Sequence, residues 1–353
     1  MHNLFRNTLI MAAAMLLAAF AQAADAQTTV TDCTDGAPIA GAAVYDKGTG
    51  LLMGVTGIDG KLPACAPQVK ALVLQHIGYA TTEKDLSAIS GDTIAMAPIS
   101  HSLSGVTIEN ASSDFLRLRA FVRQYNVVDG TPAYFRAGFY DFFVPTKHGA
   151  TKVVGLKGGE WENRSLTDSI AAKSSMLAMA LQLQAPSVSR NTAYSNYTKR
   201  YGVAAAGGLA EITNAKGRHI GMLRRNAADK TEEISIDSCA AEGKTINLFG
   251  FKITMYSGIL CERYDTGTAP PCLGNMLTSY MCMGLYFPKH DVACDCFTEI
   301  YVISTSTASK QDLKDERNGN VDLTTLDKPE GVPPLTGALA QAVEKMQRIG
   351  RNK

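Results

Sequence analysis

Phe115-Leu-Arg-Leu-Arg-Ala-Phe-Val-Arg-Gln-Tyr125 is a run in which apolar side chains alternate with arginine. A period of two predicts a β-strand, because successive side chains of a strand point to opposite faces of its sheet. Thr131-Pro132 then turns the chain into a second, aromatic strand over 134–144. Further β-type runs lie at 207–213, 218–224, 232–236, 245–257, 276–287 and 294–304. Together they predict a large β-rich domain over residues 111–307.

One helix is expected to interrupt these strands. Ser165 and Asp168 have the spacing of a capping box, and the run that follows contains no glycine or proline up to Gln184. Its apolar residues recur at helical spacing, so a helix is predicted near 166–183, with an α+β character for the domain. The residues expected to face inward are Leu166, Ile170, Leu177 and Leu181.

The C-terminal part divides by composition. Residues 308–334 are polar and end in Pro-Glu-Gly-Val-Pro-Pro, which is typical of a linker. Within 335–353 an apolar stripe predicts a C-terminal amphipathic helix that packs on its own domain. Its four basic residues leave a helix that binds a partner or a membrane surface as the alternative. The stripe consists of Leu335, Leu339, Val343, Met346 and Ile349.

The overall composition is that of a packed soluble protein. Of 353 residues, 46% are hydrophobic and 19% are charged. The 34 basic and 33 acidic residues leave a formal net charge of +1, so there is no basic footprint for nucleic acid. At about 150 residues per domain, this length predicts two domains.

Residues 1–26 have the order of a signal peptide. Arg6 precedes an apolar run over 9–20, and Ala24-Asp25-Ala26 is a small-residue cleavage site. We therefore expect an exported protein, located in the periplasm, associated with the outer membrane or displayed at the cell surface. No apolar run of 18 residues follows, so no transmembrane segment is expected in the mature chain.

Residues 27–110 predict a small β-sandwich at the N-terminus. Short β-type runs, among them 43–45, 51–56, 71–76, 93–97 and 106–109, alternate with Gly and Asx turn signals every 8 to 12 residues. Four segments of this region also follow the order and spacing of a known family. They are Asp35-Gly-Ala-Pro-Ile-Ala-Gly-Ala-Ala-Val44, Gly54-Val-Thr-Gly-Ile-Asp-Gly60, Leu74-Gln-His-Ile-Gly-Tyr79 and Leu103-Ser-Gly-Val-Thr-Ile108.

In these segments the chain resembles the carboxypeptidase regulatory-like domain, a transthyretin-like fold common in exported Bacteroidetes proteins and at the front of TonB-dependent receptors. Gly57 departs from the family's usual Asp or Asn, and Cys33 and Cys65 are unusual additions. Residues 114–145 resemble, more weakly, the segment that follows this domain in exported Bacteroidetes proteins. The resemblance implies an accessory module without catalytic residues.

The sequence contains no signature of a known catalytic or cofactor site. None of the six histidines has a glutamate three residues later, as a zinc carboxypeptidase would require. There is no Walker loop, Gly-x-Gly-x-x-Gly or Gly-x-Ser-x-Gly motif either. We therefore expect no cofactor and no catalytic residue of these classes.

Eight cysteines in an exported chain predict disulfides. They are Cys33, Cys65, Cys239, Cys261, Cys272, Cys282, Cys294 and Cys296. The favoured pairs are Cys33–Cys65, Cys282–Cys296 and Cys239–Cys261. A metal site from His290, Cys294 and Cys296 is the alternative, and we expect it to be disfavoured because the two thiols of Cys-x-Cys would point to opposite faces of a strand. A catalytic pair of a cysteine with His148, His219 or His290 is a further alternative.

Two groups of residues form a candidate ligand surface. Glu160-Trp161-Glu162 places two carboxylates on one side of a strand beside the sole tryptophan, which suits a glycan site or a glycosidase, or equally a solvated edge strand. The row Arg117, Arg119 and Arg123 suits an acidic ligand, or equally the solvated face of a strand.

These patterns predict a non-enzymatic cell-envelope protein that binds a glycan, a peptide or another envelope protein. The alternative is a hydrolase, either a peptidase or a glycosidase, with its site in residues 114–307. That alternative gains support if His148, Glu160 or Glu162 lines a deep pocket with a perturbed pKa.

Overall fold

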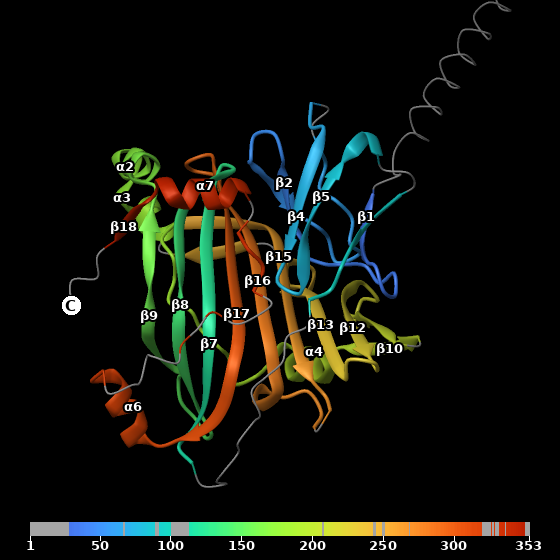
Figure 1. Ribbon diagram of the computed structural model, residues 1–353, viewed down its shortest axis with the longest axis vertical. Coiled ribbons are helices and arrows are strands. Elements are labelled where there is room, and N and C mark those ends of the chain that lie inside the picture. Colours follow the sequence, from blue (N-terminus) through green and yellow to red (C-terminus); the bar gives the residue numbers. More distant parts are fainter. Residues whose placement is uncertain are drawn as a thin grey trace, which may run out of the picture.

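The computed structural model describes residues 28–65, 68–88, 92–99, 113–206, 208–242, 245–248, 251–267, 269–319, 326, 328, 332–335 and 337–349 (Figure 1). The expected signal peptide at 1–26 and the expected strand at 106–109 lie outside these residues. No helix within them combines the length and apolar character needed to cross a lipid bilayer.

A single antiparallel sheet of twelve strands dominates the structure, in the order β10-β11-β12-β13-β15-β16-β17-β7-β8-β9-β18, with β14 paired to β15. The fold is therefore mainly β, as the alternating sequence predicted. The predicted strand at 245–257 is in fact two strands, β14 and part of β15, which pair with each other. The strands are β7 (Phe115–Val128), β8 (Thr131–Pro145), β9 (Lys152–Glu162), β10 (Gly202–Ala206), β11 (Leu209–Thr213), β12 (His219–Asn226), β13 (Thr231–Asp237), β14 (Thr245–Leu248), β15 (Phe251–Asp265), β16 (Met276–Phe287), β17 (Val292–Ala308) and β18 (Gln347–Ile349).

The alternation in β7 gives this sheet two different faces. We name them by their β7 side chains: the arginine face carries Arg117, Arg119, Phe121, Arg123 and Tyr125, and the aliphatic face carries Leu116, Leu118, Ala120 and Val122. Because register with β8 and β17 is continuous along most of β7, each face extends across the neighbouring strands.

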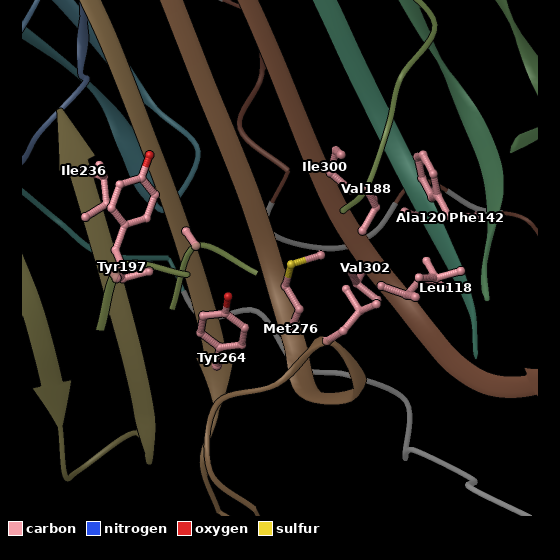
Figure 2. Close-up of a cluster of buried hydrophobic side chains, with 14 of the residues drawn as sticks. Leu118, Ala120, Phe142, Val188, Tyr197, Ile236, Tyr264, Met276, Ile300 and Val302 are labelled. Atoms are coloured by element: carbon pink, nitrogen blue, oxygen red, sulfur yellow. The ribbon is translucent and has the colours of Figure 1, made fainter. Parts of the chain in front are cut away.

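The aliphatic face is buried under the segment between β9 and β10. Figure 2 shows Leu118, Phe142 and Ile300 of the sheet together with Val188 and Tyr197 of this segment. The segment contains α2 (Arg164–Lys173), α3 (Ser175–Ala180) and α4 (Ala193–Arg200). Each fully buried aliphatic side chain contributes about 1.5–3 kcal/mol, so this cluster is a major part of the core.

The single helix predicted at 166–183 is instead the pair α2 and α3. Ser174 adopts an extended backbone (φ −162°, ψ 113°), ends α2 and caps α3, where its side chain accepts a hydrogen bond from the Leu177 N–H at 3.2 Å. A serine side chain can replace the helical backbone partner in this way, which breaks a helix that apolar spacing alone predicts to continue. The first helix is also capped by Asn163 rather than Ser165.

Residues 28–99 form a small N-terminal unit of two sheets. The parallel pair β1 (Thr29–Asp32) and β6 (Thr93–Met96) packs against a four-stranded antiparallel sheet. Val30 and Ile94 of the pair meet Val44, Leu72 and Leu74 of the larger sheet in a buried core. The four strands are β2 (Ala43–Asp46), β3 (Leu52–Val55), β4 (Ala71–His76) and β5 (Tyr79–Asp85), followed by the 3-10 turn η1 (Leu86–Ala88).

The N-terminal unit docks on the arginine face of the large sheet. Tyr280 donates a hydrogen bond from its hydroxyl to the Gly41 carbonyl at 2.7 Å, and Arg224 pairs with Asp32 and Asp35, both at 2.7 Å. Gly41 has a positive φ of 77°, and a Cβ there would lie 2.9 Å from both Ile259 Cγ2 and Tyr280 Cε1. Only glycine allows this approach.

The stretch predicted as a linker, 308–334, contains a helix. Ala308 ends β17, and α6 (Lys310–Arg317) follows at once, because Ser309 and Asp312 form a reciprocal capping box. The predicted C-terminal helix is also shorter than expected. It spans α7 (Gly337–Lys345) and is followed by β18, which pairs with β9. Of the predicted stripe, Met346 lies in the bend after α7 and Ile349 lies in β18, so neither is part of the helix.

A Gly41→Ala substitution tests the docking of the N-terminal unit. The added Cβ overlaps Ile259 and Tyr280, so we expect the free energy of unfolding to fall by about 2–4 kcal/mol in urea denaturation. Gly36→Ala is the matched control, since Gly36 has a similar φ of 73° with no atom within 4 Å of its Cβ position. Equal losses in the two variants would contradict the close contact.

Candidate functional site

The three arginines of the predicted ligand surface are each engaged by protein groups. Arg119 binds Asp141 through two hydrogen bonds, at 2.9 and 2.6 Å. Arg117 pairs with Glu316 of α6 at 2.7 Å. The row therefore holds structural partners on the arginine face, an arrangement that does not favour the hypothesis of an acidic ligand.

Arg123 differs most from the prediction that the arginine row is the solvated face of a strand. It is 3% exposed, and its guanidinium binds Glu299 at 2.7 Å and the Pro333 carbonyl at 2.8 Å. Burial of a charged pair is tolerated when hydrogen bonds satisfy both members, as they do here. This arginine links β7 and β17 to the chain segment that leads into α7.

The second part of the predicted surface lies at an edge of the sheet. Glu160 and Glu162 share a side, as predicted, and pair with Arg136 and Arg164 respectively, each at 2.8 Å. His148 is exposed in the loop before β9. These contacts hold both carboxylates in ion pairs and do not favour the hydrolase alternative.

Trp161 points to the arginine face and lies along its own strand. A Cβ on Gly159 would be 2.6 Å from Trp161 Cη2, so the indole ring covers this glycine. The ring also meets Phe135, with centroids 5.7 Å apart, and Arg348 of β18, whose guanidinium carbon is 5.9 Å from the ring centroid. The sole tryptophan is thus partly buried where β18 joins β9.

Next to the place where β18 joins β9, the edge of β9 borders a groove of about 610 Å³. We call it the β9 groove, and it is lined by Phe139, Tyr140, residues 155–160, Arg348 and Ile349. Among the described residues, β18 is the strand that pairs with this edge, and it covers only Glu160–Glu162. Residues 152–159 of the edge continue past it.

The β9 groove has a glycine-rich wall and a cationic rim. Gly138 of β8 and Gly158 of β9 lie opposite each other, and the two backbones approach closely there. A Cβ on Gly158 would lie only 2.5 Å from the Ala137 carbonyl oxygen. Lys152, Lys157 and Arg348 are exposed along the same edge. No carboxylate in the described ranges lies within ion-pair distance of either lysine.

A second cavity, of about 350 Å³, lies between β3 and the large sheet. Tyr256 donates a hydrogen bond to Asp295 there at 2.8 Å, and burial raises the pKa of Asp295 to about 6. The Tyr256 ring lies over Gly284, which leaves room for it. Sequence analysis missed this pair, because a β-bulge at Tyr256 creates it and no motif marks the bulge.

All eight cysteines are free thiols, so none of the expected disulfides is present. The register shows why two of the favoured pairs cannot form. Cys282 lies opposite Phe297 and Cys296 opposite Met283, which places these cysteines on opposite faces. Cys261 packs toward the N-terminal unit, whereas Cys239 packs with the helices of the other face. Cys33 is exposed and Cys65 is half-buried, each without a disulfide partner.

The expectation that the thiols of Cys294 and Cys296 point to opposite faces of the strand was also wrong. Residues two apart on a strand share a face, and the two sulfur atoms are 3.6 Å apart. Within the described ranges, however, no three His, Cys, Asp or Glu side chains gather into a metal-binding group, so the expected alternative with His290 is not formed.

Comparison with known proteins gives no relative: no protein-family model, no curated protein and no solved structure matches this chain. The resemblance of residues 27–110 to carboxypeptidase regulatory-like domains therefore remains a prediction.

The ion pairs that attach α6 predict a pH effect on stability. Burial and the adjacent Asp141 raise the pKa of Glu316 from 4.5 to about 7, so the folded state holds a proton that the unfolded state releases. This stabilisation is complete below about pH 4.5 and is lost as the pH rises through 7. We expect the difference in unfolding free energy, wild type minus Glu316→Gln, to fall over this interval in urea denaturation.

Asp312→Asn on the same helix is the control. Hydrogen bonds from Ser309 lower the pKa of Asp312, so its contribution has the opposite sign and is lost as the pH falls. A Glu316→Gln difference that stays flat between pH 4.5 and 7 would refute the assignment.

Proposed function

We propose that this protein is an exported, non-enzymatic binding protein of the cell envelope that captures an extended polypeptide segment along the open edge of β9. The observation that carries the proposal is the pairing of β18, which already adds a strand to this edge. Among the described residues this pairing reaches from Gln347 to Ile349, and the groove continues along β9 beyond it. Addition of a strand to a sheet edge is a common mode of peptide recognition.

The backbone of β9 offers hydrogen-bonding groups to such a segment. Arg348 donates a hydrogen bond from its guanidinium to the Gly158 carbonyl at 3.1 Å, so this carbonyl points away from β8. In a strand the N–H and C=O of one residue point the same way, and the Gly158 N–H therefore faces outward as well. A peptide strand aligned with β18 would pair with both groups.

The side chains around the groove favour a particular peptide chemistry. Phe139 and Leu156 supply apolar contact area to the groove, and Lys157 supplies positive charge. Lys152 lies exposed farther along the same strand. Glu160 brings no net negative charge, since Arg136 neutralises it. We infer that the bound segment is extended and alternates apolar with acidic residues.

The predicted export signal and the N-terminal unit are consistent with this role. An accessory sandwich of the regulatory-like kind carries no catalytic residues, and here it docks on the arginine face through contacts with Tyr280 of β16 and Arg224 of β12. Its contribution would be to cover that part of the sheet and leave the β9 edge as the binding surface.

The sole tryptophan makes the proposal directly testable. Because Trp161 contacts Arg348 at the end of the β9 groove, we expect titration with a synthetic peptide of alternating valine and glutamate to change its fluorescence and to saturate. The same peptide with alternate amides methylated should not bind, because it cannot pair with the edge. Lys157→Glu should weaken binding about three- to tenfold.

Lys216→Glu is the matched control, because Lys216 is exposed in the turn between β11 and β12, near the other edge of the sheet. Equal effects of the two substitutions, or equal binding of the methylated peptide, would overturn strand addition. Saturable quenching by neutral oligosaccharides in place of the peptide would instead identify a glycan site. A variant without residues 350–353 shows whether these residues compete for the edge, in which case the peptide binds it more tightly.

A further inference from the structure

Cys294 and Cys296 form a pair of thiols on one face of β17. Their sulfur atoms are 3.6 Å apart, which is within sulfur hydrogen-bond distance. Residues two apart on a strand have Cα atoms about 6.6 Å apart, and disulfides span Cα distances of about 4.4–6.8 Å. A bridge between them is therefore within reach, at the long end of the range.

The two thiols differ in access. Cys294 is completely buried, whereas Cys296 is partly exposed. The hydrogen bond with Cys296, together with burial, raises the pKa of the Cys294 thiol well above its ordinary value. An incoming reagent therefore meets Cys296 first, and Cys294 stands behind it as a resolving thiol.

The surroundings separate this pair from the other cysteines. Cys282 and Cys261 belong to the cluster on the arginine face. Cys239 shares the apolar cluster of the pair, but its thiol hydrogen-bonds to the Met255 carbonyl at 3.8 Å. The described residues supply no third ligand of the His, Cys, Asp or Glu type, so redox exchange fits the pair better than metal binding.

We propose that Cys294 and Cys296 are a redox-active dithiol that exchanges with disulfides of small molecules or of other proteins. The Cys296 thiolate attacks a disulfide R–S–S–R′, forms a mixed disulfide with one half and releases the other as R′–S⁻. The Cys294 thiolate then attacks the Cys296 sulfur, closes the Cys294–Cys296 bridge and releases R–S⁻. The protein is oxidised by two electrons, the disulfide is reduced, and the two thiol protons go to the released thiolates.

The strand geometry makes the bridged form reactive. A disulfide at the limit of its Cα span stores strain, and strained disulfides are more readily reduced. The pair would consequently accept and return electrons, unlike an inert structural bridge. This activity is independent of peptide binding, since the thiols lie on the aliphatic face of a central strand and not at the β9 edge.

The test is a redox titration of the full chain in buffers of reduced and oxidised glutathione. After acid quenching, alkylation and proteolysis, we expect the peptide that contains both cysteines to lose two hydrogen atoms, to resist alkylation as oxidised glutathione increases, and to recover with dithiothreitol. This measurement needs no variant. The proposal fails if both thiols remain alkylated at every ratio, or if either forms its bridge with another cysteine.

Two variants test the order of attack. In the Cys294→Ala variant, one glutathione should remain attached to Cys296. In the Cys296→Ala variant, glutathione should attach to Cys294 at least about tenfold more slowly than it attaches to Cys296 in the first variant. Cys272→Ala is the control, because Cys272 is exposed and its removal should leave the bridge unchanged. Faster modification of Cys294 than of Cys296 would overturn the assigned roles.

Discussion

The buried ion pair between Arg123 and Glu299 is the contact on which the packing of the C-terminal segment against the arginine face depends. It joins neighbouring strands β7 and β17, and Arg123 also donates to the Pro333 carbonyl, while Gln75 of the N-terminal unit reaches the Pro334 carbonyl at 3.4 Å. Loss of one member of such a pair costs about 3–5 kcal/mol. The segment held in this way leads to α7 and β18, and β18 defines the upper end of the β9 groove. An arginine in the middle of the sheet thus fixes a site at its edge.

The period-two pattern was enough to predict most strands and the mainly β class, because burial of one face forces alternation. It failed where a local polar contact outweighs periodicity, as at Ser174, which breaks a helix, and at Ser309 and Asp312, which begin one in a polar stretch. The period-two pattern could not predict the register in which neighbouring strands pair. A shift of one residue moves a side chain to the other face, and that shift separates Cys282 from Cys296.

The candidate site was predictable only in part. The residues around Trp161 were identified because a lone tryptophan between two glutamates is visible in the sequence. The edge beside them was not, since it depends on how far β18 pairs along β9, and within the described residues that pairing covers only Glu160–Glu162. Tyr256 and Asp295 are 39 residues apart and meet through a bulge and a glycine on the strand between them. Pairs of this kind depend on the three-dimensional strand order, which no local pattern encodes.

The place of β7 in the sheet has a consequence for how the chain folds. Although β7 and β8 are a simple hairpin, the other neighbour of β7 is β17, whose residues come near the end of the sheet-forming sequence. Such non-local pairing gives a high contact order, which slows folding. Until β17 is available, the β7 edge is an unpaired strand with an apolar face, the kind of surface that promotes aggregation. A chain with this topology would benefit from a chaperone that shields β7 until synthesis reaches residue 308.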